Sequence, residues 1–256
     1  MTDQHKTMQT LPDNSSSVKP LTAEFSCFEE AARYALLQRL VPAIRHHMVG
    51  EFHSMGMIAA MMDRRLQSPE PNLVSLRENC ALFSSLSRTA ASSCIDLMTW
   101  ITPKSTATVK FEAGVIECLG LLSTEFRFKG FVIVNEVTEL HAEVSSSALR
   151  SVLTSTLIAL SDLLESPADL IIRAKAVSNS VELLIDVHGA EGREKNALSP
   201  EYRILQWKEV EVLAQAEAVN LTFSNGCAQI TFTRTDSDTP IINVSSELSS
   251  LESVSL

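Results

Sequence analysis

Residues 43–66 read AIRHHMVGEFHSMGMIAAMMDRRL, and they place two adjacent histidines inside a long apolar repeat. Apolar residues recur at helical spacing from Leu37 to Met62, which predicts one helix over residues 23–67. Pro42 lies inside this pattern and predicts a kink. The histidines therefore sit on a long helix, where a structural pair, a metal site and a phosphoryl-carrying histidine are the alternatives.

A second long helix follows a short break. SPEPN at 68–72 ends the first pattern, and residues 73–101 repeat the apolar spacing. Two long helices joined by a short turn form a helical hairpin. One hairpin cannot bury both of its apolar stripes, so we expect two copies to pair into a four-helix bundle as a homodimer.

The composition changes from helical to mixed after a linker at 102–105. The later patterns alternate helices with apolar strands, and the segments LTFS and AQITFTR flank an Asn225-Gly226 turn. This predicts an α/β sandwich in the order α-β-α-β-β-α-β-β. The expected helices are 108–126, 146–165 and 203–218, and the expected strands before the last hairpin are 130–137, 169–177 and 181–188. The expected division is a disordered leader at 1–22, the hairpin at 23–102, the α/β domain at 106–236 and a disordered tail at 237–256.

Bulk properties exclude several function classes. The chain has 256 residues, is 45% hydrophobic, and carries a formal net charge of −10. Nucleic-acid binding is not expected, because phosphate contacts need clustered Lys and Arg. Without a run of 18 apolar residues, a membrane span is not expected either. Five scattered cysteines fit free thiols in a reducing cytoplasm, which is the expected location.

The element order and one short motif together carry a family resemblance. Arg45-His46-His47-Met48-Val49-Gly50 resembles the phosphoacceptor box of one subgroup of two-component sensor histidine kinases, R-H-x-φ-x-G. A dimerising hairpin followed by this α/β order is similar to the catalytic core of those kinases. The resemblance covers about residues 25–235 and puts His46 at the phosphoacceptor position.

Helix geometry agrees with that assignment. His46 points away from the core positions Ile44 and Met48, and it shares its face with Gly50 and His53. Glycine costs a helix roughly 1 kcal/mol relative to alanine, so Gly50 needs a reason, such as close approach of a partner.

The nucleotide-handling positions depart from the family pattern. Residues 148–164 resemble the helix that bears the asparagines of the kinase ATP site, but Ser155 and Ala159 occupy those two positions. Neither residue replaces an amide in holding Mg²⁺ beside a triphosphate. Where the resemblance expects an adenine-reading Asp-x-Gly, the chain has Gly189-Ala190-Glu191. Asp186 would serve only if the strand slipped by three residues.

Two further departures concern catalysis. Residues 189–203 lack a GxGxG lid, and His47 replaces the acid that usually follows the phosphoacceptor as general base. We therefore expect a degenerate nucleotide site, no bound ATP and no autokinase activity.

These features favour a histidine phosphotransfer protein, similar to phosphotransferases that look like kinase cores with a ruined ATP site. His46 would exchange a phosphoryl group with the aspartate of a response-regulator receiver domain, which supplies the Mg²⁺. The alternatives are an active kinase with an atypical ATP site and a non-catalytic receiver-binding protein. A metal site is not expected, because His47, Glu51 and His53 do not converge on one face.

Overall fold

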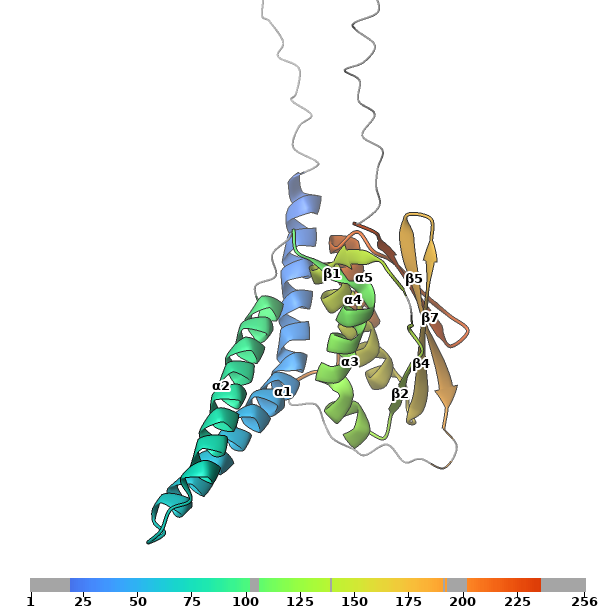
Figure 1. Cartoon of the computed structure of the whole chain (residues 1–256). Helices are drawn as coiled ribbons and strands as arrows, with labels where there is room; N and C mark the ends of the chain where they lie inside the picture. Colours follow the sequence, from blue (N-terminus) through green and yellow to red (C-terminus); the bar gives the residue numbers. More distant parts are fainter. Residues whose placement is uncertain (1–18, 102–105, 139, 191, 193–201, 236–256) are drawn as a thin grey trace, which may run out of the picture.

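The structure is a computed structural model of the chain, and it describes residues 19–101, 106–138, 140–190, 192 and 202–235. The expected fold class is confirmed: a long helical hairpin is followed by an α/β sandwich (Figure 1). The elements are α1 (Lys19–Leu66), α2 (Leu73–Ile101), β1 (Thr108–Lys110), α3 (Phe111–Phe128), β2 (Val132–Asn135), β3 (Glu143–Ser145), α4 (Ser146–Leu163), β4 (Ala168–Val177), β5 (Ser180–Gly189), α5 (Trp207–Ala216), β6 (Asn220–Ser224) and β7 (Cys227–Thr233).

The hairpin is formed by α1 and α2. The first helix begins at Lys19, so the last four residues of the expected leader are helical, since Pro20 is tolerated in a first turn. It changes direction near its middle, where Pro42 lies, so the predicted kink is present (Figure 1). The Asn72 side chain accepts a 3.1 Å hydrogen bond from the Ser75 N–H and caps the start of α2. The remaining leader, the linker at 102–105 and the tail lie outside the described residues.

The α/β unit has five strands in the order β2-β4-β5-β7-β6. β2 and β4 run parallel, and every other neighbouring pair is antiparallel. The helices lie on one face of this sheet (Figure 1). The predicted element order is confirmed, with one correction: β1 and β3 form a small two-stranded sheet that the sequence reading missed, and Thr108–Lys110 is strand rather than helix. Three-residue strands are too short to show a period-2 pattern.

Positive backbone φ angles explain both tight turns of the sheet. Asn225 and Gly226 have φ of 51° and 73°, which is the type I′ geometry that the Asn-Gly pair predicts. Ser178 adopts φ of 48° between β4 and β5. The hairpin between β6 and β7 therefore sits where the sequence placed it.

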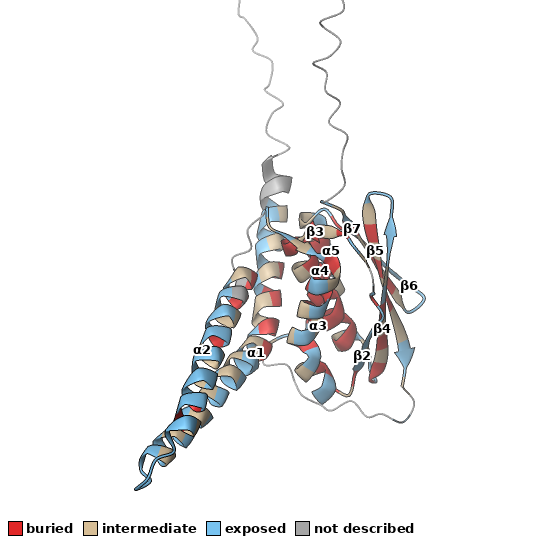
Figure 2. Cartoon of the chain, viewed as in Figure 1, coloured by how far each residue is buried: buried red, intermediate tan, exposed pale blue. Residues whose placement is uncertain are grey.

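The hairpin and the α/β unit share one apolar core. Ala32, Ala35, Leu36 and Leu40 of α1 are at most 5% exposed and belong to the same buried cluster as the helices and sheet. Figure 2 shows that buried residues extend from the upper part of α1 through α3 and α4 to the sheet, whereas the far end of the hairpin is mostly exposed. The first half of α1 is therefore an integral layer of the α/β unit. Within the described part of the chain, no helix is long and apolar enough to cross a membrane.

We expect Leu40→Ala to lower the free energy of unfolding by about 2–5 kcal/mol, because it leaves a cavity between α1 and the α/β helices. Urea unfolding followed by circular dichroism measures this loss. Ile116→Ala on α3, where the side chain is 56% exposed, is the control and should change stability little. Equal effects of the two variants would contradict a shared core.

Candidate functional site

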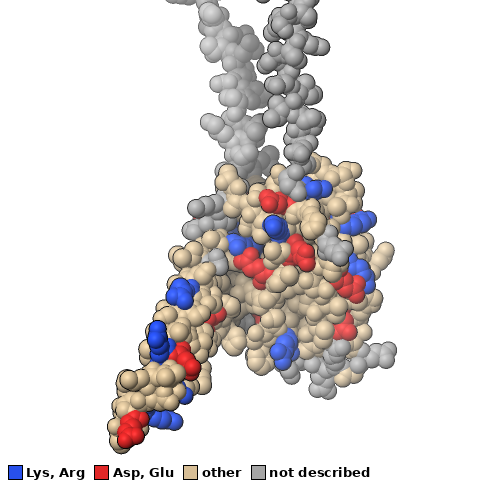
Figure 3. Space-filling view, in the orientation of Figure 1, with Lys and Arg blue, Asp and Glu red and all other residues tan. Residues whose placement is uncertain are grey.

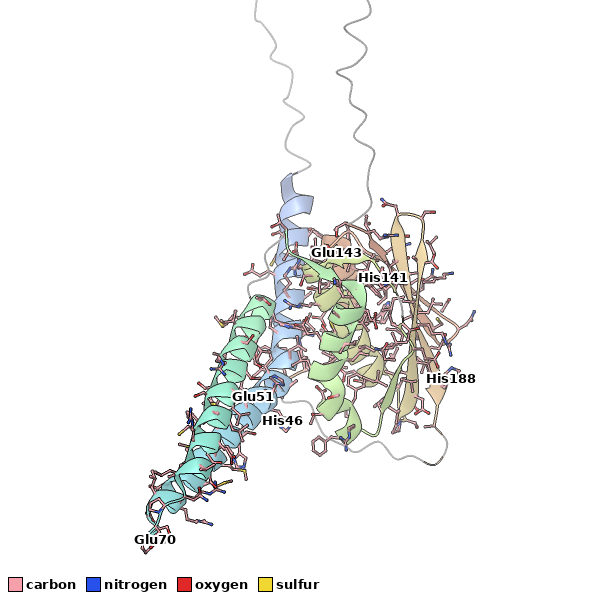
Figure 4. All side chains as sticks on the ribbon, viewed as in Figure 1. His46, Glu51, Glu70, His141, Glu143 and His188 are labelled. Carbon is pink, nitrogen blue, oxygen red and sulfur yellow. The ribbon has the colours of Figure 1, made fainter. Side chains whose placement is uncertain are left out.

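His46 lies just beyond the part of α1 that packs on the α/β unit. Its side chain is exposed. On the same helix face, the side chain of His53 and the backbone at Gly50 are exposed as well. Figure 4 shows His46 in the angle between the lower part of the hairpin and the end of the α/β unit where α3 finishes. A Cβ added at Gly50 would meet nothing within 4 Å, so no contact inside the chain requires glycine there. The imidazole of His46 is therefore accessible to a large partner.

His47 is also exposed, but it points to another side of α1. It lines an open cleft with Ser93 and Leu97 of α2 and Gly120 of α3. Consecutive residues on a helix point about 100° apart, so the two histidines serve different surfaces. Arg45, on the opposite side of His46 from His47, lines an apolar groove along α1.

The two positions that the resemblance assigns to nucleotide-binding asparagines are buried in α4. Ser155 is 0% exposed and Ala159 is 2% exposed. The Ser155 hydroxyl donates a 3.1 Å hydrogen bond to the Val152 carbonyl of its own helix. Its polar group is thus turned to the helix backbone, which is how a serine is satisfied inside a packed helix.

The face that carries these positions is directed at α1. Ser155 and Asp162 are seven residues apart on α4, so their side chains lie about 20° apart around the helix. Asp162 forms a buried ion pair with Arg39 of α1, in which Nη2 and Oδ1 are 3.1 Å apart. Helix α1 therefore covers the face that the resemblance assigns to ATP.

Asp162 is the centre of a buried ion cluster formed by Arg39, Glu125, Lys129 and Asp162. Arg39 is 3% exposed, and Lys129 and Asp162 are each 6% exposed. Lys129 Nζ lies 2.6 Å from Glu125 and 3.4 Å from Asp162, and Arg39 also approaches Glu125 at 3.4 Å. The backbone N–H of Leu205 donates to Asp162 at 3.0 Å. Three helices and the segment before α5 thus meet at one carboxylate.

Burial alone would raise the pKa of the Asp162 carboxyl. The hydrogen bond and charge of Arg39, the Leu205 N–H and the charge of Lys129 outweigh it, and the pKa lies below its usual value. The carboxylate is therefore ionised at neutral pH, and its negative charge compensates the buried cations Arg39 and Lys129.

Two further polar links join the hairpin to the α/β unit. Arg33 of α1 pairs with Glu217 at 2.8 Å, and Glu217 also accepts a 2.6 Å hydrogen bond from Ser147 of α4. Trp100 of α2 donates to Glu117 of α3 at 2.9 Å. Arg150 of α4 stacks on the Trp100 ring and pairs with Glu117 at 2.7 Å. Sequence reasoning missed these partners, because they are distant along the chain.

The other positions of the expected nucleotide site do not lie together with Ser155. Asp186 projects from the outer face of the sheet, opposite the helices, where it pairs with Arg173 at 2.5 Å. Gly189 is exposed at the end of β5, and Glu191 lies outside the described residues. Of the expected nucleotide-site residues that the structure describes, only Ser155 and Ala159 share a face.

No three His, Cys, Asp or Glu side chains among the described residues gather closely enough to hold a metal ion. On the face drawn in Figure 3, Lys and Arg are interspersed with Asp and Glu, without an extended patch of one sign over the coloured residues. His46 itself presents an exposed imidazole on α1.

No protein-family model matches the sequence, and no curated protein matches it. Solved structures with a similar arrangement include the Acinetobacter baumannii histidine kinase AdeS, which is 17% identical with a TM-score of 0.41 over 72% of this chain and 98% of that one. A bacterial phosphotransferase is 11% identical, with a TM-score of 0.38 over 77% and 95% of the two chains. A Burkholderia phymatum histidine kinase is 13% identical, with a TM-score of 0.37 over 78% and 97%. These structures include histidine kinases, the family that the sequence resembles. Their likeness is too distant to assign a role to any residue of this chain.

We expect Asp162→Asn to lower the free energy of unfolding by about 3–5 kcal/mol at pH 7, because Arg39 and Lys129 lose their buried carboxylate. The pKa of Asp162 is lowered in the folded state, so its stabilisation is present above the unfolded value of about 3.9 and is lost as pH falls through the folded value. Urea unfolding of the wild type and Asp162→Asn should give a difference in the free energy of unfolding that is constant from about pH 7 to 5. This difference should become smaller below about pH 4.

Glu211→Gln, at an exposed position of α5, is the control for the removal of one carboxylate. It should change the stability by less than about 0.5 kcal/mol. A difference between wild type and Asp162→Asn that stayed constant down to about pH 2 would contradict the stabilising role of the ionised carboxylate.

Proposed function

We propose that the chain is a histidine phosphotransfer protein of a two-component phosphorelay, and that it carries the phosphoryl group on His46. The observation that carries the proposal is the contrast between two helix faces. His46 is exposed on α1, whereas Ser155 and Ala159 are buried against protein. A phosphoryl group would then come from a partner rather than from ATP.

The proposed reaction needs only groups that an exposed histidine and a receiver domain provide. A neutral imidazole nitrogen of His46 attacks the phosphorus of an aspartyl phosphate on the receiver. The P–N bond forms as the P–O bond to the aspartate breaks, and the carboxylate leaves. The receiver's Mg²⁺ stabilises the charge on the transferring group, and the reverse reaction returns it. No base beside His46 is required, so His47 in place of an acid is compatible with the reaction.

The packing of α1 also argues against ATP as the source of the phosphoryl group. A nucleotide that contacted the Ser155 face of α4 would have to displace α1 and separate Arg39 from Asp162. Breaking a buried ion pair of this kind costs about 3–5 kcal/mol. This cost supports the expectation of no ATP binding and no autokinase activity.

Incubation with a panel of phosphorylated receiver domains tests the proposal. We expect at least one receiver to place an acid-labile label on the wild-type chain and none to label His46→Gln. His47→Gln and His53→Gln are the matched controls, and both should keep the label, because their side chains do not provide the acceptor nitrogen.

A parallel incubation with radiolabelled ATP and Mg²⁺ separates the alternatives. Label on the wild type from ATP would identify an active kinase and overturn the proposal. Receiver binding that is unchanged in His46→Gln, with no label from any source, would identify a non-catalytic binding protein.

We also propose a homodimer, which rests on an apolar stripe along α1. Leu37, Val41, Ile44, Met48 and Phe52 line one groove at helical spacing. Val41 and Phe52 are 43% and 52% exposed, although both are large and apolar. The stripe lies on the side of α1 away from His46, so a second copy could cover it and leave His46 accessible.

We expect Phe52→Glu to shift the chain from dimer to monomer in sedimentation-velocity measurements, because it places a charge in the stripe. Met57→Glu is the matched control, since Met57 is 58% exposed on the opposite face of the same helix. Unchanged sedimentation of Phe52→Glu, or an equal shift for both variants, would contradict a dimer formed by this stripe.

A further inference from the structure

Three large apolar side chains are exposed at the end of the α/β unit that faces His46. Phe128 is 61% exposed, Leu163 is 60% exposed and Ile204 is 54% exposed. We call these three residues the end cluster. They come from the last turn of α3, the last turn of α4 and the segment before α5. Single exposed apolar residues are common on protein surfaces, but a group of three at one end of a fold indicates an interaction surface.

The ion cluster holds these three residues together in space. Phe128 precedes Lys129, Leu163 follows Asp162, and Ile204 precedes Leu205, whose N–H binds Asp162. Arg39 of α1 contacts both Asp162 and the carbonyl oxygen of Arg203. Phe128 and Ile204 are therefore each next in sequence to a residue that binds the Asp162 carboxylate, and Leu163 is next to Asp162 itself. Arg39 ties this end to α1.

The same contacts place His46 beside the end cluster. Arg39 and His46 are seven residues apart on α1, so they lie about 20° apart around the helix and about 10 Å apart along it. The α/β unit covers the first of these two positions, and the helix bends near Pro42 before the second (Figure 1). His46 consequently lies in the angle below the end of the α/β unit where α3 finishes (Figure 4).

The size of a globular partner connects the two surfaces. A typical protein interface covers about 800 Å² on each partner, which corresponds to a disc of roughly 16 Å radius. A disc of that size centred on His46 reaches past Arg39 and over the end of the α/β unit. A receiver domain that brought its aspartate to His46 through an interface of this kind would also contact this end.

We infer that the end cluster is the second half of the receiver-docking surface, and that the α/β unit binds the receiver instead of a nucleotide. The inference rests on the proposed phosphotransfer through His46. The charges on this surface suit a receiver, since the exposed cations Arg127 and Arg45 are next in sequence to Phe128 and His46. The reacting face of a receiver holds Mg²⁺ with carboxylates, so cations at the rim of its binding surface are complementary to it.

The test uses the full chain and the receiver domain that labels wild-type His46 fastest, phosphorylated with labelled acetyl phosphate. Single-turnover transfer is measured against receiver concentration. We expect Phe128→Ser and Ile204→Ser each to raise the half-saturating receiver concentration about tenfold, with a change of less than about twofold in the saturating rate. A group that acted on the reacting atoms would lower the saturating rate instead.

Ile116→Ser is the matched control, because Ile116 is 56% exposed on α3 three turns before Phe128. Its transfer should equal that of the wild type. Half-saturating concentrations of Phe128→Ser and Ile204→Ser equal to that of the wild type would overturn the inference. So would a change in their sedimentation, since the end cluster would then contact a second copy of the chain.

The two proposals fail in different ways. If no receiver labels the wild-type chain, the phosphotransfer proposal is overturned. The docking surface is then tested separately, by titration calorimetry with unphosphorylated receivers. Binding weakened by Phe128→Ser but not by Ile116→Ser would support the docking surface. Equal binding by both variants, or binding of no receiver at all, would overturn it.

Discussion

The ion pair between Arg39 and Asp162 fixes the relation between the two parts of the chain. Both side chains are at most 6% exposed, so each has given up its hydration and depends on the other for compensation. Lys129 and Glu125 complete the cluster and balance its charge. Displacing α1 would leave an uncompensated charge in an apolar environment, which is far less favourable than simply exposing the neighbouring alanines and leucines. This pair therefore makes the first half of α1 a fixed layer of the α/β unit.

That fixed layer changes what α4 can do. The face of α4 that carries Ser155 is covered by α1, and the buried hydroxyls of this helix are satisfied internally. Ser155, Thr156 and Ser161 all donate to carbonyls of their own helix. Hydroxyls that bind the backbone of the same helix need no outside partner, so they can be buried without a remaining cost. Asparagines at the same positions would carry amide donors that the helix backbone cannot satisfy. The residues found at these positions are thus compatible with the cover that α1 provides.

The sequence predicted the parts of the fold that depend on local patterns. Helical periodicity located both hairpin helices, and Asn225-Gly226 located the final turn, because its two positive φ angles are a property of those residues. The strands β1 and β3 were missed, since three residues carry no period. The link between α1 and α4 was missed for another reason. Arg39 reads as an exposed cation in a helical pattern, and only its pairing with a residue 123 positions away explains its burial.

The position of His46 follows from the same helix face. Ala32, Ala35 and Arg39 are buried on it, and His46, Gly50 and His53 are exposed on it, with the bend at Pro42 between the two groups. The bend thus lies between the part of this face that the α/β unit covers and the part that is exposed. The apolar stripe of Leu37, Val41 and Phe52 lies on the other side and is continuous through the bend. Besides its contact with α2, helix α1 thereby presents three separate surfaces: one packs on the α/β unit, one is the apolar stripe of the proposed dimer, and one carries the exposed His46.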